Sequence, residues 1–495
     1  MSPQISNIMS LDDHVIKINL AKNKVKISIF EMAEAITNAV NQLENRQTEL
    51  ASKLGMSKGT LSKWLSIGSC NSLISVKELA PTSFDSLYQL STLDNQYLKY
   101  YGKEKGSENF LKLFENKKNP GTYVTAPSSG IVKSINRGEK RRFLSLVIDI
   151  DTSIEPTKFN LNEYANPIDF LVDSGTLSYF RTRPYNRMPN PDEMPSAIFI
   201  NACDTNPLSI DPFELIKYDQ DNFNTGLEFI KSINSKSKIY CSFQNDNFDQ
   251  SIDGVLYEQF SGPHPSGLVG THIHYLYPVG QNRTVWNISW QEVISIGYLI
   301  QNKILRSDKF VSLGGPNVFD PKILKIKYGS SLLEATAGKI SDNSRIISGS
   351  VLNGHTGDGV MNYLSIFDNQ ISVLPDESND ILFNWAMPGS KLHSKLPAFI
   401  SAWIKPEKYS FNVSMNGGNR AIVPISSYQE IMPLNILMTQ LLKSLITLDI
   451  ELGEKLGVLE LAPEDLALAS YVCPSKYDYQ SILNSNLEKM YEEFK

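Results

Sequence analysis

Apolar and polar positions alternate in two distinct ways between residues 153 and 319. The runs SAIFINACDTNP (196–207) and KIYCSF (238–243) are continuous and apolar, as in buried strands, while 213–233 has the spacing of an amphipathic helix. A shorter helix is expected within 159–182, with Ile168, Leu171 and Val172 inward and Gly175 after it. The apolar start GLVGTHIHYLYPV (267–279) continues the alternation as a third strand. This order predicts an open α/β sheet, and hence an α/β multi-domain protein.

The segments on either side have other patterns. Residues 113–152 hold short β-branched runs broken by turns such as Asn119–Pro120–Gly121, which predicts half of a small β-sandwich. Residues 409–495 are expected to form a helical domain, because the following apolar residues after Pro433 lie at helical spacing: Leu434, Leu437, Met438, Leu441, Leu442 and Leu445.

The N-terminal 112 residues contain one sharp local pattern, TELASKLGMSKGTLSKWL (48–65). Gly55 suits a left-handed turn between two helices and Ser57 can cap the second helix. The pattern resembles the helix-turn-helix of plasmid-partition and phage-repressor families. Its outward residues are the candidates for DNA contact: Lys58, Thr60, Ser62 and Lys63. An ordinary αα-hairpin with a glycine turn fits the same spacing.

Composition and charge exclude several classes of protein. The 495 residues are 41% hydrophobic and 20% charged, with 47 basic and 53 acidic residues for a net charge of −6. Residues 1–110 carry +1 and the remainder −7, so strong electrostatic attraction to nucleic acid is not expected. We find neither an uncharged apolar run of membrane-spanning length nor a secretory signal, which makes the cytoplasm the expected compartment.

Motifs for common cofactors are also missing from the sequence. Cys70, Cys203, Cys241 and Cys473 are far apart and form no CxxC pair, so we expect free thiols rather than disulfides or a cysteine-bound cluster. Neither a GxGxxG dinucleotide fingerprint nor a GxxxxGK[ST] phosphate loop occurs. No catalytic triad or carboxylate pair stands out, so catalysis by this chain alone is not expected.

Longer phrases carry a family resemblance over residues 113–491. SSGIVKSINRGEKR, FRTRPYNRMP, AIFINACDTNPL, VWNISWQEVISIG and FNVSMNGGNRAIVPISSYQEIMPL are among them. Together they resemble the A subunit of the Na+-translocating NADH:quinone oxidoreductase. The family's opening segment, which would supply the first half of the lipoyl-like sandwich, is replaced here by the helix-turn-helix segment.

The resemblance implies a fold, a compartment and partners. It implies a partial lipoyl-like β-sandwich (113–152), an α/β domain (153–319) similar to the NADH-binding subunit of complex I, a β-grasp-like domain (320–408) and a C-terminal helical domain (409–495). It implies a peripheral subunit on the cytoplasmic side of the bacterial inner membrane, in a complex that reduces ubiquinone with electrons from NADH and exports Na+. This chain would bind no cofactor, because flavins and iron–sulfur clusters would belong to partner subunits. The alternative is a DNA-binding protein fused to a repurposed, non-catalytic enzyme-like domain.

Four groups of residues are candidates for contact with a ligand or partner. Asp204 and Asn206 follow a predicted strand, where ligands bind in open α/β sheets. Arg181 and Arg183 would project to one side of an extended segment and could pair with an anionic ligand, pair with a partner's carboxylates or form a structural salt bridge. His264, His272 and His274 gather half of the histidines, and an HxH strand would place two rings on one face, although core packing is favoured over metal binding. Asn416, Gly417, Gly418 and Arg420 could approach a ligand, but a hairpin turn is favoured.

Overall fold

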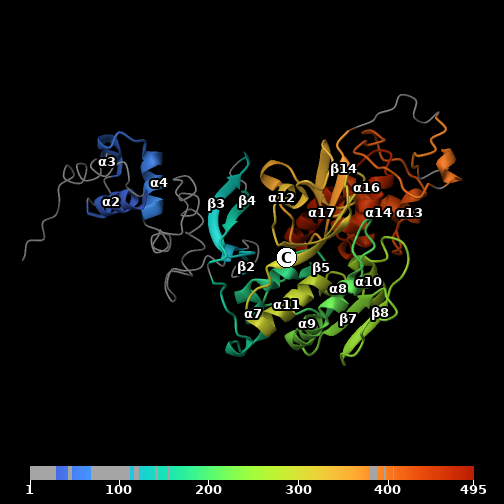
Figure 1. The fold of residues 1–495 in the computed structure, drawn as a ribbon, viewed down its shortest axis with the longest axis horizontal. Helices are drawn as coiled ribbons and strands as arrows, with labels where there is room; N and C mark the ends of the chain where they lie inside the picture. Colours follow the sequence, from blue (N-terminus) through green and yellow to red (C-terminus); the bar gives the residue numbers. More distant parts are fainter. Residues whose placement is uncertain are drawn as a thin grey trace, which may run out of the picture. The chain divides into compact units, whose positions relative to one another are not determined.

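The computed structural model describes most of the chain in two units. The described residues are 29–42, 47–68, 112–115, 122–139, 143–153, 155–377, 387–394, 397–404 and 406–494. The first unit is Met1–Thr157 and the second is Lys158–Lys495 (Figure 1). The predicted junction near residues 110–116 and Cys70 lie largely or wholly outside the described residues.

Three short helices in unit 1 share a small apolar core. They are α2 (Ile29–Gln42), α3 (Gln47–Lys53) and α4 (Lys58–Gly68). Gly55 adopts a φ of 63° between α3 and α4, and Ser57 Oγ accepts the Thr60 N–H at 3.0 Å. Leu50, Leu54 and Leu61 are buried among residues of α2. The expected turn and cap are therefore present, and the interpretation as a helix-turn-helix or as an ordinary αα-hairpin stays open.

The described residues of unit 1 also include four strands in two antiparallel pairs. β1 (Lys112–Glu115) pairs with β2 (Tyr123–Thr125), and β3 (Gly130–Arg137) pairs with β4 (Phe143–Ile150). Gly130 permits a close approach of the strands in the second pair, because a Cβ there would lie 2.2 Å from the Asp149 carbonyl oxygen. The strands expected in residues 113–152 are thus present, each in a two-stranded sheet among the described residues.

A five-stranded sheet forms the first part of unit 2, in the order β5-β9-β6-β7-β8. The strands are β5 (Arg181–Arg183), β6 (Ala197–Ala202), β7 (Lys238–Phe243), β8 (Val255–Gln259) and β9 (Val285–Ser289). Only β5 runs antiparallel to its neighbour. β6 and β7 coincide with the two predicted buried strands, whereas β8 and β9 were not predicted.

The predicted third strand is wrong, because Val269–Leu276 forms the helix α10. Val269, Ile273 and Leu276 recur at helical spacing and pack on Phe199 and Tyr240 of the sheet. The alternation of histidines in this segment suggested a strand, but the apolar residues that must be buried repeat with the period of a helix.

Four more helices belong to this sheet: α7 (Pro167–Ser174), α8 (Pro212–Tyr218), α9 (Gln220–Ile233) and α11 (Trp290–Asn302). Short 3-10 turns at Leu161–Glu163 and Thr176–Tyr179 flank α7. α9 and α11 pack closely because glycines face each other's backbone. A Cβ on Gly226 would lie 2.2 Å from the Val293 carbonyl oxygen, and one on Gly297 would lie 1.8 Å from that of Asn222.

A second five-stranded sheet follows, in the order β11-β10-β14-β12-β13. Its strands are β10 (Asp308–Gly314), β11 (Lys322–Lys327), β12 (Ser344–Ser348), β13 (His355–Thr356) and β14 (Gln370–Pro375). The central pair β10 and β14 is parallel and every other pair is antiparallel. The helix α12 (Leu332–Thr336) places Leu332 in a core with Val311 and Ile371, and a 3-10 turn spans Gly359–Met361.

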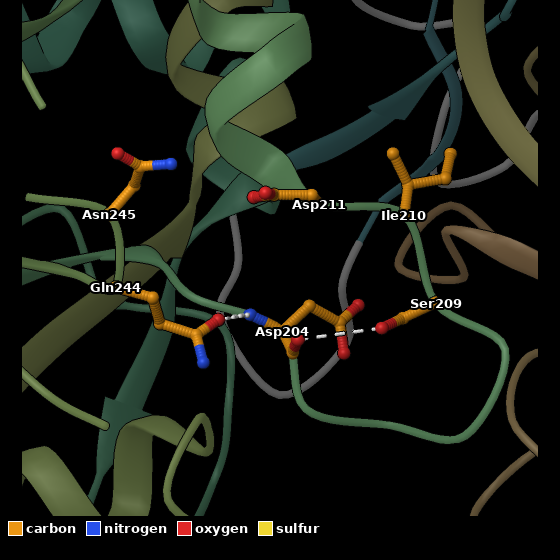
Figure 2. A pocket seen from close by; sticks show the side chains of 6 residues that line it. All are labelled: Asp204, Ser209, Ile210, Asp211, Gln244 and Asn245. Carbon is orange, nitrogen blue, oxygen red and sulfur yellow. Dashed lines mark hydrogen bonds between the residues drawn. The ribbon is translucent and has the colours of Figure 1, made fainter. Parts of the chain in front are cut away.

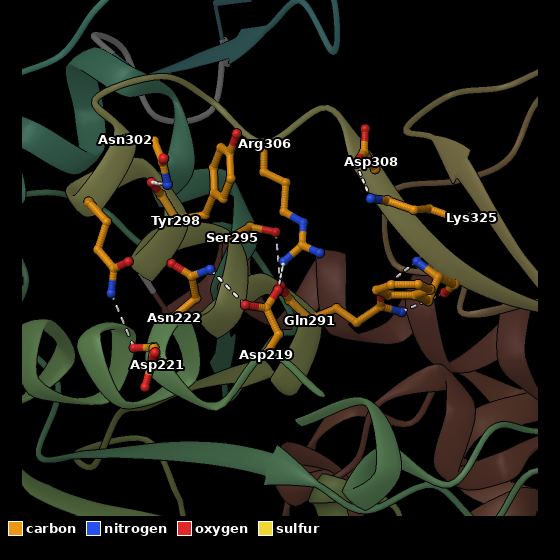
Figure 3. A network of polar contacts seen from close by, with 12 residues as sticks. Asp219, Asp221, Asn222, Gln291, Ser295, Tyr298, Asn302, Arg306, Asp308 and Lys325 are labelled. Atoms are coloured by element: carbon orange, nitrogen blue, oxygen red, sulfur yellow. Dashed lines mark hydrogen bonds and ion pairs between the residues drawn. The ribbon is translucent and has the colours of Figure 1, made fainter. Parts of the chain in front are cut away.

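Polar contacts join this second sheet to α11 (Figure 3). Gln291 Nε2 donates to the Phe310 carbonyl at 2.8 Å and to Asn369 Oδ1 at 2.9 Å, while Gln291 Oε1 accepts the Phe310 N–H at 2.9 Å. Arg306, in the link between α11 and β10, pairs with Asp219 at 2.7 Å. Both sheets are therefore held to the same helix layer.

The C-terminal helices of unit 2 enclose a separate apolar core. They are α13 (Ser427–Glu430), α14 (Met438–Thr447), α15 (Ile450–Lys455), α16 (Ala467–Val472) and α17 (Tyr479–Phe494), with 3-10 turns η6 (Ile400–Ala402) before them and η7 (Val458–Glu460) and η8 (Pro463–Leu466) among them. Met438, Leu441, Leu442 and Leu445 of the predicted stripe are buried on α14. The helix begins later than predicted, so that Leu434, which is buried, and Leu437, which is 61% exposed, both precede it. In the part of the chain that the structure describes, no helix has the length and apolar character needed to span a bilayer.

Candidate functional site

A pocket of about 360 Å³ opens at the carboxyl ends of β6 and β7 (Figure 2). Asp204, Ser209, Ile210 and Asp211 reach it from the loop after β6, and Gln244 and Asn245 from the loop after β7. Adjacent parallel strands bring these two loops to the same edge of the sheet, which is where ligands bind in such folds. The lining is polar and acidic.

Asp204 lies at the centre of this lining. Its backbone N–H donates to Gln244 Oε1 at 3.1 Å, which fastens the two loops together. Its carboxylate accepts the Asn206 N–H at 2.9 Å and Asn206 Nδ2 at 3.0 Å. Burial raises the pKa of the Asp204 carboxyl, against the lowering effect of these hydrogen bonds. The group is therefore more readily protonated than an exposed aspartate.

The loop 262–268 is fastened beside the pocket by Thr205. Thr205 Oγ1 accepts the Gly267 N–H at 3.0 Å and lies 3.1 Å from His264 Nδ1, which suits donation to a neutral ring. Asn201 Nδ2 donates to the Gly267 carbonyl at 3.0 Å. Burial lowers the pKa of His264 to about 4. His264 therefore holds the loop in place.

His272 and His274 do not share a face, because they lie two residues apart on α10 rather than on a strand. His272 is buried beside Phe260, with Nε2 donating to the Ser266 carbonyl at 2.8 Å. His274 pairs through Nδ1 with Glu460 at 2.5 Å and accepts the Asn435 N–H at its Nε2 at 3.2 Å. Among the described residues, no three His, Cys, Asp or Glu side chains are grouped to hold a metal ion.

Arg181 and Arg183 on β5 contact different parts of unit 2. Arg181 Nη1 donates to the Phe180 carbonyl at 2.9 Å, and the guanidinium carbon lies 4.1 Å from the centroid of the Phe367 ring. Arg183 is fully buried and donates to Glu464 Oε1 at 3.1 Å. This salt bridge connects β5 to η8. Of the alternatives that the sequence allowed for Arg183, the structure therefore shows a structural salt bridge.

The favoured hairpin turn at Asn416, Gly417, Gly418 and Arg420 is wrong, since no strand flanks it within the described residues 406–426. The segment instead lies along Pro474, whose carbonyl accepts Arg420 Nη2 at 3.4 Å. A Cβ on Gly417 would lie 2.7 Å from that same oxygen. Close approach to another backbone, rather than a β-turn, is what these glycines permit.

The DNA-contact candidates Lys58, Thr60, Ser62 and Lys63 lie on α4 in unit 1, and Lys58 and Ser62 are exposed. Contact with DNA stays a prediction.

Four residues that line the pocket were not predicted from the sequence: Ser209, Asp211, Gln244 and Asn245. The rule that selected Asp204 could have found Gln244 and Asn245, because they directly follow the second predicted strand.

We expect His272 to make unit 2 sensitive to acid. Burial lowers the pKa of His272 from 6.5 to about 4, so the folded chain keeps the ring neutral and the unfolded chain takes up the proton first. The stabilisation is present above pH 6.5 and is lost as the pH falls toward 4. As the pH falls from 6.5 to 4, the free energy of unfolding of the unchanged chain should decrease by up to about 3 kcal/mol more than that of the His272→Gln variant. Glutamine is chosen because its amide can still donate to the Ser266 carbonyl but does not titrate. Urea titrations at several pH values measure the free energy of unfolding of both proteins. If this free energy changes with pH to the same extent in both, the prediction is wrong. His264 does not affect the comparison, because both proteins contain it.

Three family models match consecutive parts of the chain. The NqrA N-terminal barrel-sandwich hybrid domain matches residues 105–151, the NqrA second alpha/beta domain matches 166–303 and the NQRA C-terminal domain matches 310–358. These matches begin in unit 1, cover the first sheet of unit 2 and end within the second sheet, before β14.

Curated relatives match over a longer stretch. The A subunit of the Na(+)-translocating NADH-quinone reductase of Teredinibacter turnerae is 41% identical over 389 residues, and that of Psychromonas ingrahamii is 43% identical over 390 residues. Each alignment covers 77% of this chain and 87% of the relative. A crystal structure of an NAD+-reducing NiFe-hydrogenase in the air-oxidized state aligns at 12% identity with a TM-score of 0.32, covering 69% of this chain and 77% of that one. That likeness is too low to support an inference.

Proposed function

The chain belongs to the family of the A subunit of the Na(+)-translocating NADH-quinone reductase, and we propose that it acts as the peripheral A subunit of that respiratory complex. The observation that carries the proposal is the identity of 41–43% over about 390 residues, which spans 87% of each relative. The complex that these relatives are named for passes electrons from NADH to a quinone and translocates Na+. The partners of this chain are then the other subunits of the complex, including its membrane subunits, and its place is the cytoplasmic side of the inner membrane.

In this proposal the chain binds no flavin or iron–sulfur cluster, and those groups belong to partner subunits. Cys473 supports the part of this proposal that concerns iron–sulfur clusters, because it is fully buried against Tyr428, whose OH lies 3.1 Å from its Sγ, and Tyr479. Burial would raise the pKa of the Cys473 thiol, but hydrogen bonds from Tyr428, the Tyr477 backbone and Tyr479 outweigh it and lower that pKa. The thiol is thus part of a hydrogen-bonded core rather than one of several closely spaced cluster ligands.

The polar pocket at Asp204 suits a ligand with hydrogen-bond donors rather than the apolar tail of ubiquinone. Two carboxyl groups, two amides and one hydroxyl line it, and Ile210 is its apolar residue. Any ubiquinone contact by this chain is therefore assigned outside this pocket.

The finer domain assignment is also proposed: residues 1–112, 113–152, 153–319, 320–408 and 409–495. The family models support the second, third and fourth of these regions. For 320–408, a β-grasp-like domain is supported by the central parallel pair with antiparallel flanks and one helix, although its sheet also takes in β10 from residues 308–314.

A second candidate function is DNA binding through residues 1–112, in place of the family's opening segment. The observation that favours it is the α3–Gly55–α4 turn with Lys58 and Ser62 exposed on α4. Fluorescence-anisotropy titration with duplex DNA tests it. Sequence-selective binding at physiological salt that is lost in Lys58→Ala would favour this function; weak binding that falls steeply with salt would leave only a non-specific electrostatic contact.

Complementation tests the main proposal. In a bacterium that lacks its own A subunit but retains the other subunits, the chain should restore Na+-dependent, NADH-driven quinone reduction in isolated membranes and co-purify with the complex. A chimera carrying a relative's opening segment in place of residues 1–112 is the matched control, and we expect it to assemble better because that segment would supply the first half of the sandwich predicted for residues 113–152. Failure of both proteins to assemble would contradict the proposal.

A further inference from the structure

The segment that precedes the C-terminal helices is folded back on itself without regular secondary structure beyond η6. We call its described residues 387–394, 397–404 and 406–411 the strap. The Ile400 N–H donates to the Pro388 carbonyl at 2.8 Å, and Ser401 Oγ donates to the Leu392 carbonyl. Figure 1 shows this orange segment around residue 400 at the right-hand edge of unit 2. The strap therefore has a defined internal structure.

A ring cluster fastens the strap to α16. Tyr471 OH lies 3.0 Å from His393 Nδ1, and the His393 ring packs edge-on to Tyr409 and Phe411 at 5.3 Å and 5.4 Å between centroids. A Cβ on Gly389 would lie 2.4 Å from the Phe399 ring, so the chain also crosses itself tightly there. These contacts attach the strap to the helical domain through His393, on which Tyr409 and Phe411 pack. We call Trp403 and Ile404, which lie between His393 and Tyr409 in the sequence, the tip of the strap.

The tip exposes large apolar side chains to solvent. Trp403 is 72% exposed and Ile404 is 69% exposed, and Ile400 and Met387, which also belong to the strap, are 41% and 45% exposed. By contrast, Trp286 and Trp290 are each only 1% exposed. An ordered loop that presents a tryptophan and an isoleucine together marks an interaction surface.

The charge of this region is opposite to that of the rest of the chain. Residues 387–426 contain five basic residues and one acidic residue, for a net charge of +4, which leaves −10 for the remaining residues. Lys391 and Lys408 are exposed on the strap. Trp403 therefore lies in a basic stretch of an otherwise acidic sequence, with two exposed lysines on the strap itself.

We propose that the tip of the strap contacts an anionic phospholipid bilayer, with Trp403 and Ile404 in the headgroup layer and Lys391 and Lys408 near lipid phosphates. This rests on the proposed function, which puts the chain beside a membrane. Tryptophan prefers the boundary between headgroups and acyl chains, and lysines next to it are attracted to anionic lipids. A protein partner could cover the apolar tip, but it would give no reason for the concentration of positive charge, so a bilayer is favoured.

Vesicle sedimentation with the purified full chain tests this contact. Vesicles of equal parts phosphatidylcholine and phosphatidylglycerol should bind the chain more tightly than phosphatidylcholine alone, and added salt should weaken that binding. The double variant Trp403→Ser, Ile404→Ser should reduce affinity by about tenfold or more, and Lys391→Glu with Lys408→Glu should remove the preference for anionic vesicles. Leu437→Ser, at an exposed leucine outside the strap, is the matched control and should bind as the unchanged chain does.

Circular dichroism and melting temperature show that each variant is folded. Equal vesicle binding by the Trp403 variant and the unchanged chain would overturn the proposal. A second pair of results would also overturn it: the unchanged chain does not bind vesicles, and the Trp403→Ser, Ile404→Ser variant no longer co-purifies with the complex. The tip would then contact a protein partner. The vesicle experiment and the complementation experiment can fail independently. If the chain restores quinone reduction but does not bind vesicles, the lipid contact is wrong and the proposed function stands.

Discussion

Replacing Lys309 by methionine should lower the free energy of unfolding of unit 2 by about 3–5 kcal/mol. Lys309 and Glu292 are both fully buried, with Nζ 3.8 Å from Oε1, and Lys309 Nζ also donates to the Ile366 carbonyl at 2.6 Å. Burial lowers the pKa of Lys309 and raises that of Glu292, and each charge opposes the shift of the other. Without the lysine, the Glu292 carboxylate is left buried and unpaired, or must take up a proton. Urea unfolding followed by circular dichroism measures the loss.

The double variant Lys309→Met, Glu292→Gln separates the charge effect from packing. It removes the unpaired carboxylate at similar volume, so it should recover much of the stability lost in the single variant. If the double variant is less stable than Lys309→Met, the buried pair is not the reason for the loss. Lys322→Met is the control, because its pair with Asp320 is exposed and contributes little.

Replacing Gly297 by valine should destabilise unit 2 by about 3 kcal/mol or more, because α9 and α11 would have to separate. The added Cβ would lie 1.8 Å from the carbonyl oxygen of Asn222, and that oxygen belongs to helix backbone that cannot rotate away as a side chain could. Since α11 also carries Gln291, which holds the second sheet through Phe310, the damage should extend to both sheets. Thermal melting and limited proteolysis report it.

Gly280→Ala is the matched control for this prediction. No heavy atom lies within 4 Å of a Cβ added there, so the change should leave the melting temperature nearly unaffected. If Gly297→Val melts as Gly280→Ala does, the close approach of the two helices is not required for stability.

Much of the site's framework could be predicted from the sequence, because it rests on local periodicity. The buried strands β6 and β7 are continuous apolar runs, and the residue after each run, Cys203 or Gln244, begins a loop at the sheet edge where ligands bind in such folds. What could not be predicted is that Gln244 accepts the Asp204 N–H, a contact between residues 40 positions apart. Strand pairing decides that contact, and a single sequence does not state which strands are neighbours.

The histidines are a second example of contacts that depend on the tertiary structure rather than on the local sequence. Their spacing suggested one shared face, but α10 turns His272 into the core and His274 toward Glu460, which is 186 residues away. Apolar residues that must be buried set the conformation of the segment, and the polar residues follow.

The sequence by itself determined the family, the central strands of the α/β sheet and the apolar stripe of the C-terminal helices, since these depend on residue identity and short-range period. Only the tertiary structure decided that Arg183 meets Glu464, 281 residues away, that Lys309 meets Glu292, and that Trp403 is left exposed. The physical reason is that burial and pairing of a side chain depend on which distant elements pack against its own, and that packing is a property of the whole fold rather than of any one segment.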